Sequence, residues 1–253
     1  MTTADTNTEP AIVVGASRGL GRGVATALAR TGRPVVAVAR SGAALTELAD
    51  GVGNIRPEVA DATDPAIASS LLEKYEPEVV VLVAGATPHM EPLQHQTWET
   101  FSVNWESDVR MAFHWLREAL ITPLQPRSRF VMVSSGAALN PSGSPLSGGY
   151  AGAKATQRLI TTYAQDESNR TGLDITFTTV LPQFAPLTGV GKPAVAAYAA
   201  QAGLSVEEFL TARPFPPLTT EIAGDAIVEL VQAETANVAP SYMVDGDGLH
   251  KLP

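Results

Sequence analysis

The chain has 253 residues, of which 45% are hydrophobic and 17% charged, and its formal net charge is −9. This length suits one large α/β domain, and the share of core-forming residues excludes a disordered chain. The acidic balance argues against nucleic acid or an anionic membrane surface as a partner, and no apolar run reaches the roughly 18 to 20 residues of a transmembrane helix. Because the chain contains no cysteine, disulfides, thiolate zinc sites and a cysteine nucleophile are excluded.

Residues 1–10 (MTTADTNTEP) are polar and acidic. They lack the basic region and apolar stretch of a secretory signal, so we expect a disordered lead-in. One domain is expected over residues 11–253, because no low-complexity linker or internal repeat divides them. The lack of cysteine fits a reducing compartment, and we expect the protein to be cytoplasmic.

Short apolar runs predict strands, and stretches with 3.6-residue periodicity between them predict helices. The predicted strands lie at 11–15, 34–39, 79–84, 129–134, 175–180 and 242–244. The predicted helices lie at about 19–31, 42–50, 64–75, 97–121, 150–171 and 219–234. Runs that are apolar on both faces suit parallel strands buried between helices. The alternation therefore predicts a single-domain, Rossmann-like α/β fold, a doubly wound parallel sheet of about seven strands with helices on both faces.

Residues 182–218 interrupt this alternation with a long segment rich in proline, alanine and glycine. Within it, 194–201 and 205–212 are predicted as short helices. The segment follows the carboxyl end of a predicted strand, where open α/β sheets bind ligands. We interpret it as a substrate loop, and the alternative is a surface segment that only covers the sheet.

The first predicted strand is followed by glycines in a G-x-x-x-G-x-G spacing. The segment reads Gly15, Ala16, Ser17, Arg18, Gly19, Leu20, Gly21. Glycine is needed where φ is positive and where the backbone must approach a phosphate closely. The helix that begins here presents free N–H groups and a positive dipole end. The loop therefore predicts a dinucleotide site, although such glycines also arise from packing alone.

The spacing of these glycines resembles the glycine loop of the classical short-chain dehydrogenases/reductases, although Val14 stands where that family often has threonine. The resemblance continues to the end of the chain, where residues 242–248 (YMVDGDG) are similar to the family's closing strand and turn. It implies a nicotinamide cofactor and oxidoreductase chemistry.

The end of the second predicted strand indicates which nicotinamide cofactor is bound. Enzymes that prefer NAD usually place an acid there to bind the ribose 2′-hydroxyl, but this chain has Arg40 and Ser41. The guanidinium of Arg40, with that of Arg18 from the other side, could hold a 2′-phosphate. This predicts NADP(H); the alternative is that both are ordinary surface arginines.

Tyr150 and Lys154 are four residues apart in the segment YAGAK, which places both on one face of a helix. A phenol has an ordinary pKa of about 10, and a nearby ammonium lowers it because the charge stabilises the phenolate. Such a tyrosine can give a proton to a carbonyl oxygen as hydride arrives, or accept one in the reverse direction. The pair predicts an acid/base site. The alternative is a tyrosine on a helix face beside a surface lysine.

The family resemblance adds two further catalytic residues and a second role for Lys154, which would hold the nicotinamide ribose. Ser135, the second serine of FVMVSS, would bind the substrate oxygen and stabilise developing charge. Its distance from Tyr150 is slightly longer than usual in the family, so the choice between Ser134 and Ser135 stays open. Asn104 would hold a water that links the lysine to solvent; by itself it is a packing residue.

The resemblance also implies several cofactor contacts. Asp61, with Ala62 beside it, would contact the adenine, although an aspartate in the segment DATDP is equally suited to capping a helix. The small residues Ala84 and Gly85 would let the nicotinamide ribose approach. The remaining expected contacts with the nicotinamide come from Tyr150, Pro182 and Thr188.

Three departures from the family pattern surround this pocket. Leu82 and Val83 replace the asparagine pair that stabilises the family's central sheet, Gln183 replaces the glycine after Pro182, and Thr188 lies six residues past that proline instead of five. They put the nicotinamide contact of Thr188 in question.

These observations predict an NADP(H)-dependent oxidoreductase that reduces a ketone or other carbonyl to an alcohol, reversibly. The histidines have no metal-ligand spacing, so no metal is expected. The partners expected are a small carbonyl or alcohol substrate and, by family resemblance, one or three further copies of the chain. The alternatives are a catalytically weak NADP(H)-binding regulator, or an epimerase or lyase on the same fold.

Overall fold

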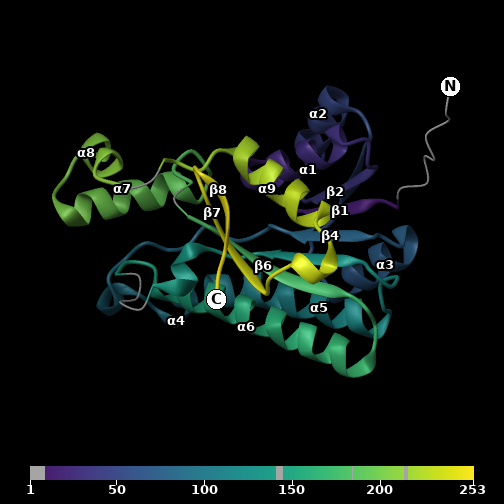
Figure 1. Ribbon diagram of the computed structural model, residues 1–253. Helices are drawn as coiled ribbons and strands as arrows, with labels where there is room; N and C mark the ends of the chain where they lie inside the picture. The colour runs from purple at the N-terminus through teal and green to yellow at the C-terminus, as the bar shows by residue number, and fades with distance from the viewer. Residues whose placement is uncertain (1–8, 141–144, 184, 214–215) are drawn as a thin grey trace.

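The computed structural model describes residues 9–140, 145–183, 185–213 and 216–253. Most of the predicted lead-in, residues 1–8, lies outside the described residues. The described chain forms one sheet in the order β3-β2-β1-β4-β5-β6-β7-β8 with helices on both faces (Figure 1). Its strands are β1 Ala11–Val14, β2 Val35–Ala39, β3 Ile55–Val59, β4 Val79–Leu82, β5 Arg129–Val133, β6 Thr176–Pro182, β7 Ser241–Asp245 and β8 Gly248–Lys251.

Strands β1 to β7 are parallel, as the buried apolar runs predict. The predicted number of about seven strands misses β8, which pairs antiparallel with β7 at the edge of the sheet. A tight turn joins the two strands, with Gly248 at φ 114° and the N–H of Asp247 bonded to the Asp245 carboxylate. The edge strand β3 also lacks an apolar run, because three of its five residues are exposed.

One face of the sheet is covered by α1 Gly19–Arg30, α2 Gly42–Val52 and α9 Thr220–Gln232. Helices α1 and α9 pack with their backbones nearly in contact, because a Cβ on Gly224 would lie 2.7 Å from the Gly23 carbonyl oxygen. The opposite face is covered by α3 Pro65–Tyr75, α5 Arg110–Ile121 and α6 Gly148–Thr171 (Figure 1). These two layers bury separate apolar clusters on the two faces of the sheet.

The predicted helix 97–121 is wrong as one continuous α-helix. It consists of α4 Trp98–Asn104, a π-helical turn Trp105–Val109, and α5. We call residues 105–109 the π-turn. Thr97 begins α4 with a capping box, in which its side chain and that of Thr100 each accept a backbone N–H. A single π-helical turn is rare. It changes the direction of the side chains around it, so the side chains after the turn point to other neighbours than they would on a straight helix.

Within the predicted substrate loop lie α7 Gly191–Ala202 and α8 Val206–Thr211, close to the two predicted short helices. They project to one side of the molecule, at the carboxyl edge of the sheet (Figure 1). A hydrogen bond of 2.8 Å between Tyr198 and Ser147 ties α7 to the start of α6. Short 3₁₀ turns complete the described chain: Leu93–His95, Gly136–Leu139 and Thr235–Asn237.

None of the helices described in the structure combines the length and apolarity needed to cross a membrane.

Candidate active site

A cleft of about 1600 Å³ runs along the carboxyl ends of β1, β2, β4, β5 and β6. It extends from the glycine loop to α7 and α8, so the predicted substrate loop forms part of its wall. All the predicted cofactor residues line it: Gly15, Ser17, Arg18, Gly19, Leu20, Gly21, Arg40, Ser41, Asp61, Ala62, Ala84, Gly85, Tyr150, Lys154, Pro182 and Thr188. Of the predicted catalytic residues, Ser135, Tyr150 and Lys154 line it as well. Asn104 does not belong to the lining of this cleft, because it is buried behind it.

Gly15 and Gly21 allow close packing of the backbone in the glycine loop, and the helix that follows begins without a side-chain cap. Gly15 has φ 93°, and a Cβ on it would lie 2.7 Å from the backbone nitrogen of Ala84. A Cβ on Gly21 would lie 2.1 Å from the carbonyl oxygen of Gly15. Helix α1 begins after Arg18 without a side-chain cap and without an acid in its first turn. Its first N–H groups and positive dipole end are therefore left for an anion, and these residues fit a dinucleotide phosphate.

Arg18 and Arg40 are both exposed residues that line the cleft. Arg18 lies beside the segment after β6, since a Cβ on Gly189 would lie 3.7 Å from its Cζ. Arg40 follows the last residue of β2 and is close enough to Asp61 to act on its charge.

Asp61 is part of a local turn and does not cap a helix. Its Oδ1 accepts hydrogen bonds from the backbone nitrogen of Thr63 at 3.1 Å and from the Thr63 hydroxyl at 2.8 Å. These bonds lower the pKa of Asp61 from its ordinary value, and the positive charge of Arg40 adds to the effect. The N-cap of α3 is Asp64, which accepts from Ala66. The helix-cap interpretation thus applies to Asp64, and adenine binding by Asp61 stays a prediction.

The two serines after β5 have different environments. The Ser134 hydroxyl is buried and donates to the backbone oxygen of Lys154 at 2.8 Å, so it fastens β5 to α6. Ser135 is partly exposed to the cleft and begins the 3₁₀ turn Gly136–Leu139, with its Oγ accepting from Ala137 at 3.2 Å. Its own O–H can still donate to a substrate oxygen. The geometry therefore favours Ser135 over Ser134. The following residues 141–144 lie outside the described residues.

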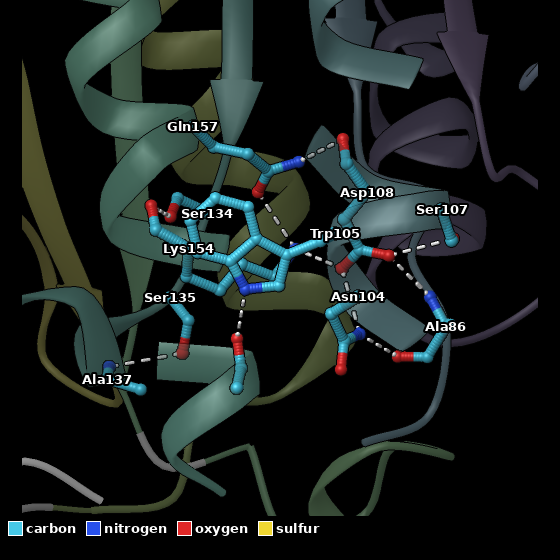
Figure 2. Close-up of polar contacts among 11 residues, drawn as sticks. Ala86, Asn104, Trp105, Ser107, Asp108, Ser134, Ser135, Ala137, Lys154 and Gln157 are labelled. Carbon is cyan, nitrogen blue, oxygen red and sulfur yellow. Dashed lines mark hydrogen bonds and ion pairs between the residues drawn. The ribbon is translucent and has the colours of Figure 1, made fainter. Parts of the chain in front are cut away.

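Tyr150 and Lys154 lie on the first turns of α6 and line the same cleft as Ser135. The Nζ of Lys154 is 5.5 Å from the centroid of the Tyr150 ring. Trp105 of the π-turn supports this part of α6, because its indole N–H donates to the backbone oxygen of Gly149 at 3.2 Å (Figure 2). The helix that carries the predicted acid/base pair is thus held by the element opposite.

The ammonium of Lys154 is buried and forms two contacts that the sequence did not predict. It lies 3.0 Å from Oδ2 of Asp108, a residue of the π-turn, and donates to Oε1 of Gln157 at 3.0 Å. Gln157 in turn donates to the backbone oxygen of Asp108 at 3.0 Å, so the three residues form a closed set of contacts (Figure 2). We call Asp108, Lys154 and Gln157 the buried lysine cluster.

Burial on its own lowers the pKa of Lys154, but the carboxylate of Asp108 and the neighbouring Tyr150 outweigh it, so the pKa is raised above its ordinary value. The side chains of Lys154 and Asp108 are only 5% and 0% exposed. Lys154 therefore keeps its positive charge in a place where an unpaired ammonium would lose it.

The Asp108 carboxylate has three further donors. Its Oδ1 accepts from the backbone nitrogen of Ala86 at 2.8 Å and from the Ser107 hydroxyl at 2.9 Å. Its Oδ2 accepts from Nδ2 of Asn104 at 3.2 Å, and the same amide donates to the backbone oxygen of Ala86 at 2.9 Å. Asn104 therefore positions Asp108 and the segment after β4, and contacts Lys154 only through Asp108.

This arrangement accounts for one departure from the family pattern. Leu82 is buried within β4, and Val83 packs against the apolar cluster that contains β1. No asparagine pair follows the strand, and the backbone of Ala86 is instead held by Asp108 and Asn104. A Cβ on Gly85 would lie 2.8 Å from Oδ2 of Asp108, so the small residue here makes room for the carboxylate.

The other two departures lie at the end of β6. A Cβ on Gly136 would lie within 2.5 Å of the Gln183 amide, so this side chain fills the space beneath the turn that Ser135 begins. The Thr188 hydroxyl donates to the oxygen of Ala185 at 2.9 Å and accepts from the nitrogen of Gly191 at 2.9 Å. It is used within its own turn, and a contact from Thr188 to a nicotinamide stays a prediction.

Asp108 is the residue of this site that the sequence did not reveal. An acid within a predicted amphipathic helix is usually solvated, and nothing in the local pattern marks the π-turn. The spacing of Asn104 and Asp108, four residues apart, was the one available signal, because it places both on one face. Among residues 9–140, 145–183, 185–213 and 216–253, no group of acids and histidines is arranged to hold a metal ion.

Known proteins resemble this chain in sequence and fold. The 3-oxoacyl-(acyl-carrier-protein) reductase FabG of Escherichia coli (strain K12) is 29% identical over 153 residues, which are 57% of this chain and 61% of that protein's length.

Solved structures share the fold at lower identity. An actinorhodin polyketide ketoreductase solved with NADPH has a TM-score of 0.79 at 20% identity, covering 96% of this chain and 98% of that chain. A 3-ketoacyl-(acyl-carrier-protein) reductase from Brucella melitensis complexed with NADH has a TM-score of 0.75 at 20% identity, covering 94% and 97%. A short chain dehydrogenase from Burkholderia cenocepacia in complex with NADP has a TM-score of 0.78 at 19% identity, covering 94% and 96%.

The family model described as short chain dehydrogenase matches residues 9–199, which is most of the chain. Together with the glycine loop, the Tyr150–Lys154 pair and the parallel sheet, this match shows that the protein belongs to the short-chain dehydrogenase/reductase family of oxidoreductases.

Proposed function

We propose that this protein is an NADP(H)-dependent oxidoreductase that reduces a ketone or other carbonyl compound to an alcohol, reversibly. The observation that carries the proposal is that Ser135, Tyr150 and Lys154 line one cleft together with the phosphate-binding glycine loop. The family supports oxidoreductase chemistry, and solved structures with this fold hold NADPH, NADH or NADP.

The bound nicotinamide would supply a hydride, that is a proton with two electrons, to the carbonyl carbon of the substrate. Ser135 would donate a hydrogen bond to the carbonyl oxygen and so fix the face of the substrate. Tyr150 would give its phenolic proton to that oxygen, so that the carbonyl becomes an alcohol and the cofactor is left oxidised. Lys154 would stabilise the phenolate that Tyr150 becomes and hold the nicotinamide ribose.

NADP(H) is favoured over NAD(H) because the end of β2 carries Arg40 and Ser41 and no acid, and Arg18 of the glycine loop also lines the cleft. A guanidinium can bind a 2′-phosphate with two parallel hydrogen bonds, whereas an acid would bind the free 2′-hydroxyl of NAD.

The substrate end of the cleft supports an apolar carbonyl compound. Its wall beyond Tyr150 contains the apolar side chains of Met90, Leu139, Val190, Val195 and Phe209. Val190 belongs to the segment after β6, Val195 to helix α7 and Phe209 to helix α8. This supports the substrate-loop interpretation of 182–218, of which residues 184, 214 and 215 lie outside the described residues.

A dimer or tetramer is also part of the proposal. Helices α5 and α6 expose large apolar side chains, namely Phe113 at 53%, Ile121 at 57%, Leu159 at 69% and Tyr163 at 64%. Exposed apolar side chains gathered on neighbouring helices mark a surface that a second copy can cover.

The test is the loss of NADPH absorbance with a panel of small, aromatic, steroid and β-ketoacyl ketones, with NADH in parallel. Turnover that is much faster with NADPH than with NADH is expected. Tight NADPH binding without turnover of any compound would favour the regulator, the alternative from another class of protein. Conversion of a substrate without net oxidation of the cofactor would favour an epimerase or lyase. A failure to bind either cofactor would overturn the proposal.

A further inference from the structure

The buried lysine cluster contains a carboxylate that the proposed reaction does not use. Asp108 is 0% exposed, and its partner Lys154 is 4% exposed. Taking two charges out of water costs several kcal/mol for each ion, and only close pairing and further hydrogen bonds offset this cost. A buried pair of this kind is weak evidence for stability, so its presence beside Tyr150 calls for a functional explanation.

The π-turn is what brings the carboxylate to this place. Asp108 lies in the final part of Trp105–Val109, and its backbone oxygen accepts from Gln157 of α6. The backbone and the side chain of one residue thus both contact α6, the backbone oxygen through Gln157 and the carboxylate through Lys154 (Figure 2). Single π-turns inside α-helices frequently mark functional sites, which agrees with this placement.

We infer that Asp108 is a positioning residue for the reaction, which holds the ammonium of Lys154 charged and directed at Tyr150 and the nicotinamide ribose. This inference rests on the proposed function of the same cleft. Asp108 touches neither the reacting atoms nor the phenol of Tyr150 in the described contacts, and it acts through Lys154.

The surroundings of Lys154 leave this role to Asp108. The charged or titratable groups that face the ammonium are the Asp108 carboxylate from the π-turn and the Tyr150 phenol from α6. Strand β5 presents Ser134, whose hydroxyl donates to the backbone oxygen of Lys154, and the segment after β4 contacts Asp108 through the backbone nitrogen of Ala86. Without Asp108, the burial of Lys154 would be opposed only by the smaller effect of Tyr150 and would favour the neutral amine.

The consequence for catalysis depends on pH. When Lys154 is neutral, it no longer stabilises the phenolate of Tyr150, and its hold on the ribose is weakened. In the wild type the pairing keeps Lys154 charged across the neutral and mildly alkaline range. A variant without the carboxylate loses that charge as the pH rises.

The test compares Asp108→Asn with Asp166→Asn in the full-length protein. Asp166 is an exposed aspartate of α6, so its replacement changes the net charge equally without touching the cleft. For Asp108→Asn we expect kcat for carbonyl reduction to fall about tenfold or more. In the pH profile of kcat, the decline on the alkaline side should begin about one pH unit lower than in the wild type. The Kd for NADPH, measured by fluorescence at the acidic end of the range, should change much less. Asp166→Asn should keep the wild-type profile.

A measurement that needs no turnover separates this inference from the proposed function. The chain has only four lysines, Lys74, Lys154, Lys192 and Lys251, so the side-chain nitrogens can be followed singly by ¹⁵N NMR. The Lys154 nitrogen should titrate above the ordinary lysine pKa of about 10.4 in the wild type, and below it in Asp108→Asn. If the wild type turns over no carbonyl compound but this titration shifts as stated, the proposed function fails and the electrostatic role of Asp108 stands.

If Asp108→Asn does not fold, Asp108→Ser is used in its place. The smaller serine side chain leaves space for solvent beside Lys154, and its hydroxyl oxygen can accept a hydrogen bond from the ammonium. A Lys154 titration that is the same with and without the carboxylate would overturn the inference. So would an Asp108 variant whose kcat falls by the same factor at every pH, since that is the signature of a merely structural role.

Discussion

The Nζ atom of Lys154 lies 3.0 Å from Oδ2 of Asp108, and both side chains are buried at the carboxyl end of the sheet. This contact joins the two halves of the site. Lys154 belongs to the helix that carries Tyr150, and Asp108 also holds the backbone of Ala86, next to the small residues that line the cleft after β4. The predictions below follow from this pair and from the cleft around it.

The pair predicts how stability depends on pH. Because the pKa of Lys154 is raised in the folded protein, its contribution to the free energy of unfolding is fully present below the unfolded pKa of about 10.4, and it is lost as the pH rises through the folded value. In Asp108→Asn the folded pKa should lie below the unfolded one. Stability should then rise with pH between these two values, relative to Asp166→Asn. Melting temperatures from neutral to mildly alkaline pH measure this, and parallel curves for the two variants would contradict it.

Cofactor preference should depend on Arg40. Arg40→Ala removes the guanidinium proposed to bind the 2′-phosphate, so the Kd for NADPH should rise about tenfold or more, while the Kd for NADH stays nearly constant. Arg56→Ala is the matched control, because Arg56 is exposed on the edge strand β3 and is absent from the lining of the described cleft. If the Kd values for NADPH and NADH rise by the same factor in Arg40→Ala, this arginine does not bind the 2′-phosphate.

The close approach in the glycine loop should make Gly21 intolerant of any side chain. A Cβ there would meet the Gly15 oxygen at 2.1 Å, so Gly21→Ala should cost about 1–3 kcal/mol of stability and weaken NADPH binding. Gly51→Ala is the control, because a Cβ on Gly51, in helix α2, has nothing within 4 Å. It should be stabilising by about 0.5–1 kcal/mol, since alanine favours helix. Chemical denaturation measures both, and similar effects at the two positions would contradict the geometry.

The proposed assembly can be tested on α6. Replacing Leu159 and Tyr163 together by glutamate places charge on side chains that are 69% and 64% exposed in the single chain. If a second copy covers them, the variant should have a smaller mass in light scattering than the wild type and should remain folded. A wild type that is already a monomer would contradict the proposed dimer or tetramer.

Much of the fold could be predicted because its strands are buried on both faces. Four-residue runs such as Val79–Leu82 are entirely buried, and they stand out as continuous apolar segments. The edge of the sheet lacks this signal: β3 is mostly exposed and β8 pairs on one side only. The number of strands was therefore underestimated at the edge of the sheet, where strands are not buried on both faces and need no continuous apolar run.

The site could be predicted where spacing along the chain determines proximity. The three glycines of one loop form a local pattern, as do Tyr150 and Lys154 on one helix, and both groups of residues line the same cleft. The environment of Lys154 is not local, because Asp108 reaches it from a different helix through a π-turn that no hydrophobic period reveals. The choice between Ser134 and Ser135 likewise needed the bond from Ser134 to the Lys154 backbone.

The central claim is that Tyr150 is the proton donor of a carbonyl reductase, and Tyr150→Phe tests it most directly because it removes one oxygen and keeps the ring beside Lys154. With a carbonyl compound that the wild type reduces, steady-state NADPH oxidation and NADPH binding by fluorescence would be measured for both proteins. The account predicts that turnover falls by about a hundredfold or more while the Kd for NADPH stays near the wild-type value. Substantial residual turnover with intact binding would contradict it.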